Sequence, residues 1–245
     1  MTVKKKTRIN PTEKKHTMEK APFILLILNC QKYRTKALFQ KRTWLTQLPA
    51  NILYFHVIGD PDMDIPFCFF PEENRLMVRV QDDYVSLPKK VLAALRAVSQ
   101  TYCFEYIFKT DDDQMVVNIS FFSVLTRLLS SAVHSVEKKV HYGGNIVDVM
   151  HSYVSQYSRI HPELPANLPI QKTKYCSGRF YFLSREAVAF LVTDRVSALV
   201  AREYLEDYAI GFYLAPIFKV NIMHLGVGKH FVDVPPEEYD KMMRK

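Results

Sequence analysis

Three consecutive aspartates, Asp111 to Asp113, are the strongest chemical feature of the sequence. The apolar run Phe104 to Phe108 predicts a buried strand that leads into them through Lys109 and Thr110. Adjacent carboxylates raise each other's pKa, and a bound divalent cation offsets that cost. Mg²⁺ and Mn²⁺ bind one or two carboxylates and leave other positions to water and phosphate oxygens. Because ligands of open α/β sheets bind at strand ends, the pattern favours a metal-phosphate site over its alternative, a solvated acidic turn.

A second acidic pair, Glu206 and Asp207, lies at the start of a helix expected over residues 205–214. The helix dipole favours carboxylates at this position by about 0.3 to 1 kcal/mol each, which is a sufficient structural explanation. The pair gains a chemical meaning if it faces the same cleft as the three aspartates. A carboxylate beside a metal-bound phosphate ester could then serve as the general base toward an incoming hydroxyl.

The elements that position these residues follow an alternating pattern. From Pro22 onward, short apolar runs alternate with segments of helical periodicity, which predicts an α/β layer structure. Strands are expected at residues 23–28, 51–58, 75–80, 104–108, 140–147, 179–183 and 217–223, the third of them as an edge or partly exposed strand. Ser86, Asn118 and Ser184 are expected to cap the helices that follow them. Residues 60–74 and 150–173 are expected to be loops, because they are rich in proline or lack periodicity.

The length and composition describe an ordinary globular protein. The chain has 245 residues, of which 48% are hydrophobic and 24% charged, and this excludes disorder as the main state. The longest apolar run, Phe23 to Leu28, is far shorter than the roughly 20 residues of a membrane-spanning helix. The four cysteines form no CxxC pair, which excludes a zinc ribbon. We expect reduced thiols, with two long-range disulfides as the alternative.

The chain is expected to have three parts, of which the first is strongly basic. Residues 1–20 contain seven Lys or Arg against two Glu and are expected to form a basic flexible arm. One domain is expected over residues 21–233, followed by a C-terminal tail at 234–245. The arm is expected to be solvated, and contact with anionic lipid or nucleic acid is the alternative. The net charge of +8 is concentrated there, so it gives little support to nucleic-acid binding.

Several common motifs are missing from the sequence. It contains no Walker A string and no GxGxxG, so neither a P-loop nor a standard dinucleotide fingerprint is present. It contains no GxSxG or HExxH either, which excludes the commonest hydrolase and zincin signatures. A nucleotide would therefore be bound through a metal ion and scattered contacts.

Five segments together resemble one known family. They are Arg34 with Lys41–Trp44, Gln81–Lys90, Cys103–Asp113, Lys174–Ser184 and Leu205–Gly211. In this order and spacing they resemble the β-1,3-glycosyltransferases, which include β-1,3-galactosyltransferases, N-acetylglucosaminyltransferases and, more distantly, the Fringe enzymes. The order of the segments is much more specific than any one of them.

The resemblance implies a single-domain GT-A-type nucleotide-sugar-binding fold, in which a mixed central sheet is flanked by helices. It implies an inverting transfer of a hexose or N-acetylhexosamine from a UDP-sugar to a hydroxyl of a glycan or glycoprotein, with a β-1,3 linkage, and Mn²⁺ or Mg²⁺ as the cofactor. Carried over to this sequence, Asp113 would bind the metal ion and Asp207 would be the catalytic base. A C-terminal histidine would be a further metal ligand. We prefer His230, because His224 lies in an apolar strand pattern that favours a core histidine.

The resemblance also implies substrate-binding residues. On the donor side these are Arg34, Arg42, Asp82, Lys109, Asp111 and Asp112. On the acceptor side they are Tyr175, Gly178, Tyr181 and Glu206, where aromatic faces would pack on sugar CH surfaces. The sequence departs from the family pattern at Arg179, where the family tends to have glycine, and at Tyr208, which replaces the usual valine. Only 38 residues follow Asp207, so we expect the cysteine-bearing C-terminal region of many animal members to be shortened here.

Two other functions and two locations stay open. The chain could be a non-catalytic sugar- or nucleotide-binding module of the same fold, although the intact acidic segments favour an enzyme. It could also be a basic scaffold or nucleic-acid-binding protein, which only the tail and overall charge support; we expect no specific nucleic-acid partner. Animal members of the family are anchored in the Golgi, and the sequence shows no anchor. We expect a cytoplasmic location, in a microbial or virus-infected cell, with a Golgi-type location or peripheral membrane contact through the basic arm as alternatives.

Overall fold

The computed structural model describes residues 18–133, 139–217 and 222–243. Most of the expected basic arm lies outside these ranges. Most of the strand expected at residues 217–223 lies outside them as well. At its C-terminal end the structure contains the short strand β13, Met223–His224. Within the described ranges, none of the helices combines the length and apolarity needed to cross a membrane. All four cysteines are free thiols.

An eight-stranded mixed sheet forms the centre of the molecule, which confirms the predicted fold class. The strand order is β13, β9, β12, β7, β2, β3, β5, β4. Their bounds are β2 Phe23–Leu28, β3 Ile52–Gly59, β4 Phe67–Phe70, β5 Arg75–Val78, β7 Tyr106–Asp111, β9 Tyr142–Val149 and β12 Thr173–Ser184. Strands β7, β2, β3 and β5 are parallel, and β12 joins them antiparallel to β7. The carboxyl ends of β2, β3 and β7 therefore lie at the same edge of the sheet.

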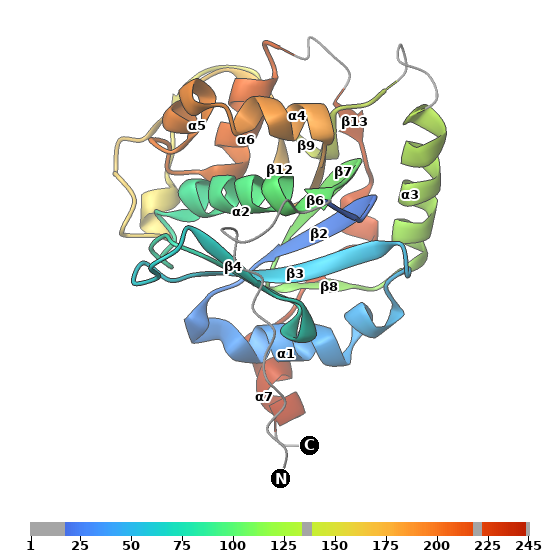
Figure 1. The fold of residues 1–245 in the computed structure, drawn as a ribbon. Helices are drawn as coiled ribbons and strands as arrows, with labels where there is room; N and C mark the ends of the chain where they lie inside the picture. The colour runs from blue at the N-terminus through green and yellow to red at the C-terminus, as the bar shows by residue number, and fades with distance from the viewer. Residues whose placement is uncertain (1–17, 134–138, 218–221, 244–245) are drawn as a thin grey trace.

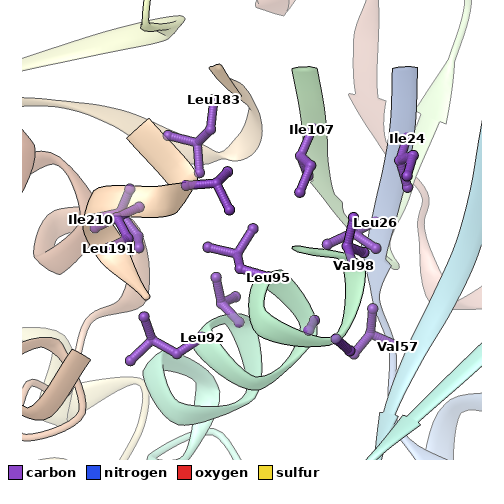
Figure 2. Close-up of a cluster of buried hydrophobic side chains, with 14 of the residues drawn as sticks. Ile24, Leu26, Val57, Leu92, Leu95, Val98, Ile107, Leu183, Leu191 and Ile210 are labelled. Atoms are coloured by element: carbon purple, nitrogen blue, oxygen red, sulfur yellow. The ribbon is translucent and has the colours of Figure 1, made fainter. Parts of the chain in front are cut away.

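Both faces of β2 are buried, as its uniformly apolar sequence predicts. Alternate residues belong to different hydrophobic clusters because side chains of a strand point to opposite faces. Ile24 and Leu26 pack in a cluster with residues of four helices, α2 Leu87–Thr101, α4 Arg185–Leu191, α5 Asp194–Val200 and α6 Glu206–Leu214 (Figure 2). Phe23, Leu25 and Ile27 pack on the opposite face with α3, Ser120–Val133. Helix α3 accordingly stands apart from the other four (Figure 1).

The remaining elements are short. The helices are η1 Gln31–Tyr33, α1 Arg34–Arg42, η2 Trp44–Gln47, η3 Pro71–Glu73, η5 Tyr157–Arg159, η6 Val227–Lys229 and α7 Pro236–Met243. The strands are β1 Glu19–Lys20, β6 Tyr102–Cys103, β8 Gln114–Val116, β10 Tyr153–Val154, β11 Pro169–Ile170 and β14 Phe231–Asp233. Helix α7 lies against α1 (Figure 1), so residues assigned to a tail from the sequence form a packed helix.

Three local predictions differ from the structure. The expected loop 60–74 contains β4, whose apolar residues form the edge strand. Strand β5 lies beside it and is partly exposed, as expected for an edge or partly exposed strand. Ser86 precedes α2, but its side chain makes no capping hydrogen bond; instead its backbone N–H donates to Asp83 Oδ1 at 2.8 Å. His224 is exposed on β13 and is not a core histidine. The cap at Ser184 is confirmed, because its hydroxyl accepts from the Ala187 N–H.

Candidate active site

The three aspartates lie where two parallel strands end. Asp111 is the last residue of β7 and is aligned with Leu28, the last residue of β2. Asn29, which follows β2 directly, donates from Nδ2 to Asp112 Oδ2 at 2.9 Å. After Asp113 the chain turns into β8, which pairs with β14 near the C-terminus. The acidic triplet is thus held between the end of β2, helix α1 and the β8–β14 ladder.

Each carboxylate of the triplet has a different partner. Asp111 accepts a hydrogen bond from Lys109 Nζ at 2.7 Å, and Asp112 accepts one from Lys36 Nζ at 2.8 Å. Asp113 Oδ1 accepts from the side-chain amide of Gln114 at 2.9 Å. Throughout the described ranges, no cationic side chain pairs with Asp113. Asp113 is therefore the member of the triplet whose charge remains available to a metal ion.

Burial sets the electrostatics of the triplet. It raises the pKa of Asp112 to about 6, although the neighbouring Lys36 acts in the opposite direction. Asp111 is only partly buried, with 39% of its side chain exposed, but this burial still raises its pKa against the lowering effect of Lys109. The negative charges of the other aspartates add to both shifts. Keeping these groups ionised costs free energy, and a bound cation would reduce that cost.

Lys109 links the triplet to helix α6. Its side chain is only 5% exposed, and Nζ lies 2.7 Å from Asp111 Oδ1, 2.9 Å from Glu206 Oε2 and 3.0 Å from the Gly178 carbonyl oxygen. Burial alone would lower the pKa of Lys109, but the two carboxylates raise it above its ordinary value. Lys109 is therefore a permanent cation that neutralises carboxylates from two distant parts of the sequence.

The Glu206–Asp207 pair has two distinct environments. Glu206 is buried, and it accepts a hydrogen bond from the Tyr181 hydroxyl in addition to its ion pair with Lys109. Asp207 accepts from two backbone N–H groups, Gly178 at 2.9 Å and Tyr208 at 2.8 Å. Burial raises the pKa of Asp207, which makes its carboxylate a stronger base than an exposed aspartate. Glu206 thus has structural partners, while Asp207 is oriented by the backbone.

Gly178 is the point at which the two acidic groups meet. A Cβ atom placed on Gly178 would lie 2.9 Å from Asp111 Oδ2, 3.1 Å from Lys109 Nζ and 3.7 Å from Asp207 Oδ2. The carboxylates of Asp111 and Asp207 therefore face the same small volume, one from the end of β7 and the other from the start of α6. The second acidic pair and the triplet are therefore neighbours in space, as its chemical interpretation requires. A side chain larger than hydrogen at position 178 would fill that volume.

The remaining residues expected to bind the donor are Asp82, which is held by protein groups, and two exposed arginines. Asp82 accepts from the Gln31 N–H at 2.8 Å, the Gly59 N–H at 2.9 Å and Lys90 Nζ at 2.6 Å. These contacts tie Asp82 to the segment after β2 and to the last residue of β3, and protein groups already contact both of its oxygens. Arg34 and Arg42 are exposed on α1. Arg34 contacts Gln31 Oε1 from Nε at 3.1 Å.

The two tyrosines expected on the acceptor side differ in exposure. Tyr181 is 1% exposed, and its hydroxyl contacts Glu206, so it supports the site from within the core. Tyr175 is half-buried and packs edge-on against Tyr208 with ring centroids 5.8 Å apart. Tyr208, the departure from the family pattern, also accepts a hydrogen bond from the Gln171 N–H at 3.0 Å. The substitution thus connects α6 to the loop that precedes β12.

The structure does not bring His230 next to Asp113. Phe231 is aligned with Val116 and Asp233 with Gln114 in the antiparallel β8–β14 ladder, and the His230 carbonyl accepts from the Val117 N–H at 2.8 Å. Continuing this register places Val234 opposite Asp113. His230 is four residues away from Val234, which is roughly 13 Å at the usual strand rise. Asp233 lies much nearer, because Gln114 Nε2 donates to Asp233 Oδ1 at 2.7 Å as well as to Asp113.

Several residues of the site were not predicted from the sequence. Asn29 could have been found, because it follows an apolar strand just as the triplet does. Gln114 is adjacent to the triplet, but a single amide carries no signal of its own. Lys36 and Asp233 reach the site from α1 and β14, and only the tertiary structure shows that they do.

The residues present are compatible with a divalent cation. In the parts of the chain that the structure describes, no group of three or more His, Cys, Asp or Glu side chains is arranged as a complete metal site. Mg²⁺ and Mn²⁺ need no such group, since they use one or two protein carboxylates and complete their coordination with water and substrate phosphates. Asp113 lacks a cationic partner and shares the Gln114 amide with a second carboxylate, Asp233. This donor set fits a hard cation that is bound together with a phosphate ligand.

Comparison with known proteins gives distant structural matches and one family. The inositol-1-phosphate CTP transferase from T. maritima has 11% identity and a TM-score of 0.43, with 94% of this chain and 96% of that chain covered. The glycosyltransferase GlyE of Streptococcus pneumoniae TIGR4 has 10% identity and a TM-score of 0.37, with 84% and 45% covered. HddC from Yersinia pseudotuberculosis has 9% identity and a TM-score of 0.39, with 90% and 98% covered. No curated protein matches the chain by sequence.

The galactosyltransferase family model matches residues 39–225, well over half of the chain. The matched range contains Lys109, the acidic triplet and the Glu206–Asp207 pair. It ends before β14 and α7. The chain therefore belongs to the galactosyltransferase family and is a UDP-sugar hexosyltransferase with a GT-A-type fold, as its sequence resemblance implied.

Proposed function

We propose that this enzyme is an inverting, metal-dependent transferase that moves a hexose or N-acetylhexosamine from a UDP-sugar to a hydroxyl of a glycan or glycoprotein, with a β-1,3 linkage. The observation that carries the proposal is the convergence of Asp111 and Asp207 on Gly178. A donor held at the triplet and an acceptor held at Asp207 would then be close together, on the open side of Asp111 and Asp207. The two reacting groups would thus be kept close together, which lowers the entropic cost of the reaction.

Asp207 has the properties of the catalytic base. Its two backbone hydrogen bonds, from Gly178 and Tyr208, fix the orientation of the carboxylate. They are made to different oxygens, so each oxygen keeps further lone-pair capacity toward an acceptor hydroxyl. Burial raises the pKa of this group, and a base with a raised pKa accepts a proton more readily. Such a base contributes typically about 10² to 10⁴ in rate.

The proposed transfer step needs no acid–base group besides Asp207. The acceptor hydroxyl oxygen forms a bond to the anomeric carbon of the donor sugar while the bond from that carbon to the β-phosphate oxygen breaks. The hydroxyl proton goes to Asp207, and UDP leaves with the bonding electrons. Because the oxygen attacks opposite the leaving group, an α-linked donor gives a β-linked product.

The triplet would hold the diphosphate end of the donor. Asp113 would bind the metal ion, while Asp111 and Asp112, held by Lys109 and Lys36, would approach the donor sugar, ribose or metal-bound water. When bound there, Mn²⁺ or Mg²⁺ would act as a Lewis acid that stabilises the charge developing on the leaving diphosphate. The fixed ion pairs keep Asp111 and Asp112 in place before the donor arrives, which reduces the reorganisation needed on binding.

Calorimetric titration with UDP tests the donor site. We expect the wild-type protein to bind UDP with Mn²⁺ present and to lose most of that affinity in chelator. Asp113→Ala should lose most of the Mn²⁺-dependent binding, because it removes the carboxylate that no side-chain cation neutralises. Asp148→Ala is the matched control, since Asp148 is a partly exposed carboxylate in an ion pair with Lys174 on β12. Equal UDP affinity in chelator would refute the metal dependence.

A second experiment tests the chemistry. Asp207→Asn should keep the affinity for UDP and abolish sugar transfer, because the amide cannot accept the acceptor proton. An unchanged turnover number would exclude Asp207 as the base. Transfer from UDP-galactose and UDP-N-acetylglucosamine to a panel of glycans, followed by NMR of the product, would identify the donor sugar, the anomeric configuration and the linkage position. An α-linked product would rule out inversion.

A further inference from the structure

The C-terminal segment beyond the family match is attached to the acidic triplet. Asp233 accepts from Gln114 Nε2 at 2.7 Å and from Arg179 Nη2 at 3.0 and 2.7 Å. The Val234 N–H donates to the carbonyl oxygen of Asp113 at 2.8 Å. Arg179 is the position at which this sequence departs from the family glycine, and its side chain anchors β14. The segment is therefore built into the donor side of the site.

Helix α7 brings one aromatic residue into this region. Tyr239 is 7% exposed, and its ring packs edge-on against Phe39 of α1 with ring centroids 5.2 Å apart. The same helix α1 supplies Lys36, whose ammonium binds Asp112. Tyr239 thus packs α7 against α1, the helix whose Lys36 binds the triplet.

The Tyr239 hydroxyl is buried and has no hydrogen-bond partner among the described residues. The chain places Tyr239 near the triplet, because Val234, five residues before it, donates from its N–H to the Asp113 carbonyl oxygen. Burial raises the pKa of the Tyr239 phenol, and the negative charges of Asp113, Asp112 and Asp233 add to that shift. The phenol consequently keeps its proton and can act only as a neutral donor or acceptor near the triplet.

A buried hydroxyl without a partner destabilises a protein, and such groups are rare unless a ligand or an ordered water completes their hydrogen bonds. The three nearby carboxylates already accept hydrogen bonds from Gln114, Lys36 and Arg179. An occupant that brings an acceptor oxygen to this region would give the phenol the hydrogen bond that it lacks. The phosphate oxygens of the donor meet this requirement, and an ordered water is the other candidate.

We propose that Tyr239 is a donor-binding residue whose hydroxyl donates a hydrogen bond to a phosphate oxygen of the nucleoside diphosphate. The identity of this ligand rests on the proposed function. Three carboxylates would repel a phosphate unless a divalent cation lay between them, so the contact should form only with Mn²⁺ or Mg²⁺ present. Helix α7 then becomes part of the donor site, with Arg179 and Asp233 as the positioning residues that hold it there.

Calorimetry on the full chain tests the proposal, with UDP as the probe and Mn²⁺ present. Tyr239→Phe removes only the hydroxyl, and we expect the affinity for UDP to fall about tenfold or more, as for loss of a hydrogen bond to a charged group. The thermal unfolding temperature should stay the same or rise, because the change removes an unpartnered polar atom and keeps the ring on Phe39. In chelator the wild-type and variant proteins should not differ.

Tyr106→Phe is the matched control. The Tyr106 hydroxyl is also buried and without a partner, but Tyr106 is the first residue of β7, at the opposite end of the strand from the triplet. Its loss should leave the affinity for UDP unchanged. If the wild-type protein binds UDP with Mn²⁺ and Tyr239→Phe binds it equally well, the proposal is overturned and the phenol is a water ligand. If the wild-type protein itself does not bind UDP, the proposed function fails first.

Discussion

Replacing Lys109 with methionine tests how the two acidic groups are held together. Lys109→Met keeps the length and apolar volume of the side chain but removes the one cation that contacts both Asp111 and Glu206. The Glu206 side chain is 6% exposed and that of Asp111 is 39% exposed, so the variant leaves one buried and one partly exposed carboxylate without a counter-ion.

The magnitude follows mainly from Glu206. Removing one partner of a buried ion pair costs about 3 to 5 kcal/mol, because the remaining charge stays buried. The contact with Asp111 adds little, since solvent screens a carboxylate that is more than a third exposed. We therefore expect the free energy of unfolding to fall by about 3 to 5 kcal/mol at pH 7.5. That is a large share of the roughly 5 to 15 kcal/mol that stabilises a typical protein.

The size of the loss should depend on pH in a defined direction. Without Lys109, the pKa of Glu206 in the folded state rises further above its unfolded value, because burial already raises it and Lys109 lowers it. The folded variant then binds more protons than the unfolded chain in the acid range, so the loss is complete at high pH and shrinks as the pH falls through the raised pKa. Adding Glu206→Gln should recover much of the stability, since the amide can accept from the Tyr181 hydroxyl without a charge.

Equilibrium urea unfolding at pH 7.5 and pH 5 measures these differences. Lys174→Met is the control, because the Lys174–Asp148 pair is largely exposed and should contribute little. A Lys109→Met variant within 1 kcal/mol of the wild-type protein at pH 7.5 would refute the reasoning. So would a loss that stays constant between the two pH values.

Three further changes follow from the same geometry. Gly178→Ala places a methyl group 2.9 Å from Asp111 Oδ2, so we expect the free energy of unfolding to fall by about 1 to 3 kcal/mol in urea unfolding. The transfer rate of the folded variant should fall as well. Tyr181→Phe removes the hydroxyl that donates to buried Glu206 and should cost about 1 to 3 kcal/mol by the same assay, with UDP affinity retained. In steady-state kinetics the transfer rate should fall on acidification at a pH above the ordinary aspartate pKa of 3.8, because the partly buried base Asp207 must be unprotonated. A flat profile down to that pH would contradict its role.

Local patterns in the sequence predicted most of the sheet and the acidic core of the site. The triplet was identifiable because it follows a buried strand directly along the chain. Glu206 and Asp207 were identifiable because they begin a helix. Strand β4 was missed because four apolar residues between prolines form only a short run, and its pairing with β5 is decided by the sheet around it.

The C-terminal contribution was much harder to predict. Helix α7 has the local signals of a helix start, with Pro236 at its first position and Glu237 and Glu238 in its first turn. Its apolar residues are few, and Tyr239 with the two methionines at its end gives little periodicity. What fixes this segment is the long-range contact between Asp233, Arg179 and Gln114, which join three strands that are distant in the sequence.

The distribution of cations explains which carboxylates remain chemically available. Lys109 neutralises Asp111 and Glu206, Lys36 neutralises Asp112, and Arg179 neutralises Asp233. Within the described ranges, Asp113 and Asp207 are the acidic residues of the site that no side-chain cation holds. A metal ligand must offer its negative charge to the ion, and a general base must offer a lone pair to a proton, so a strong ion pair would oppose either role. The pairing pattern therefore separates the carboxylates that build the site from the two that are suited to act in it.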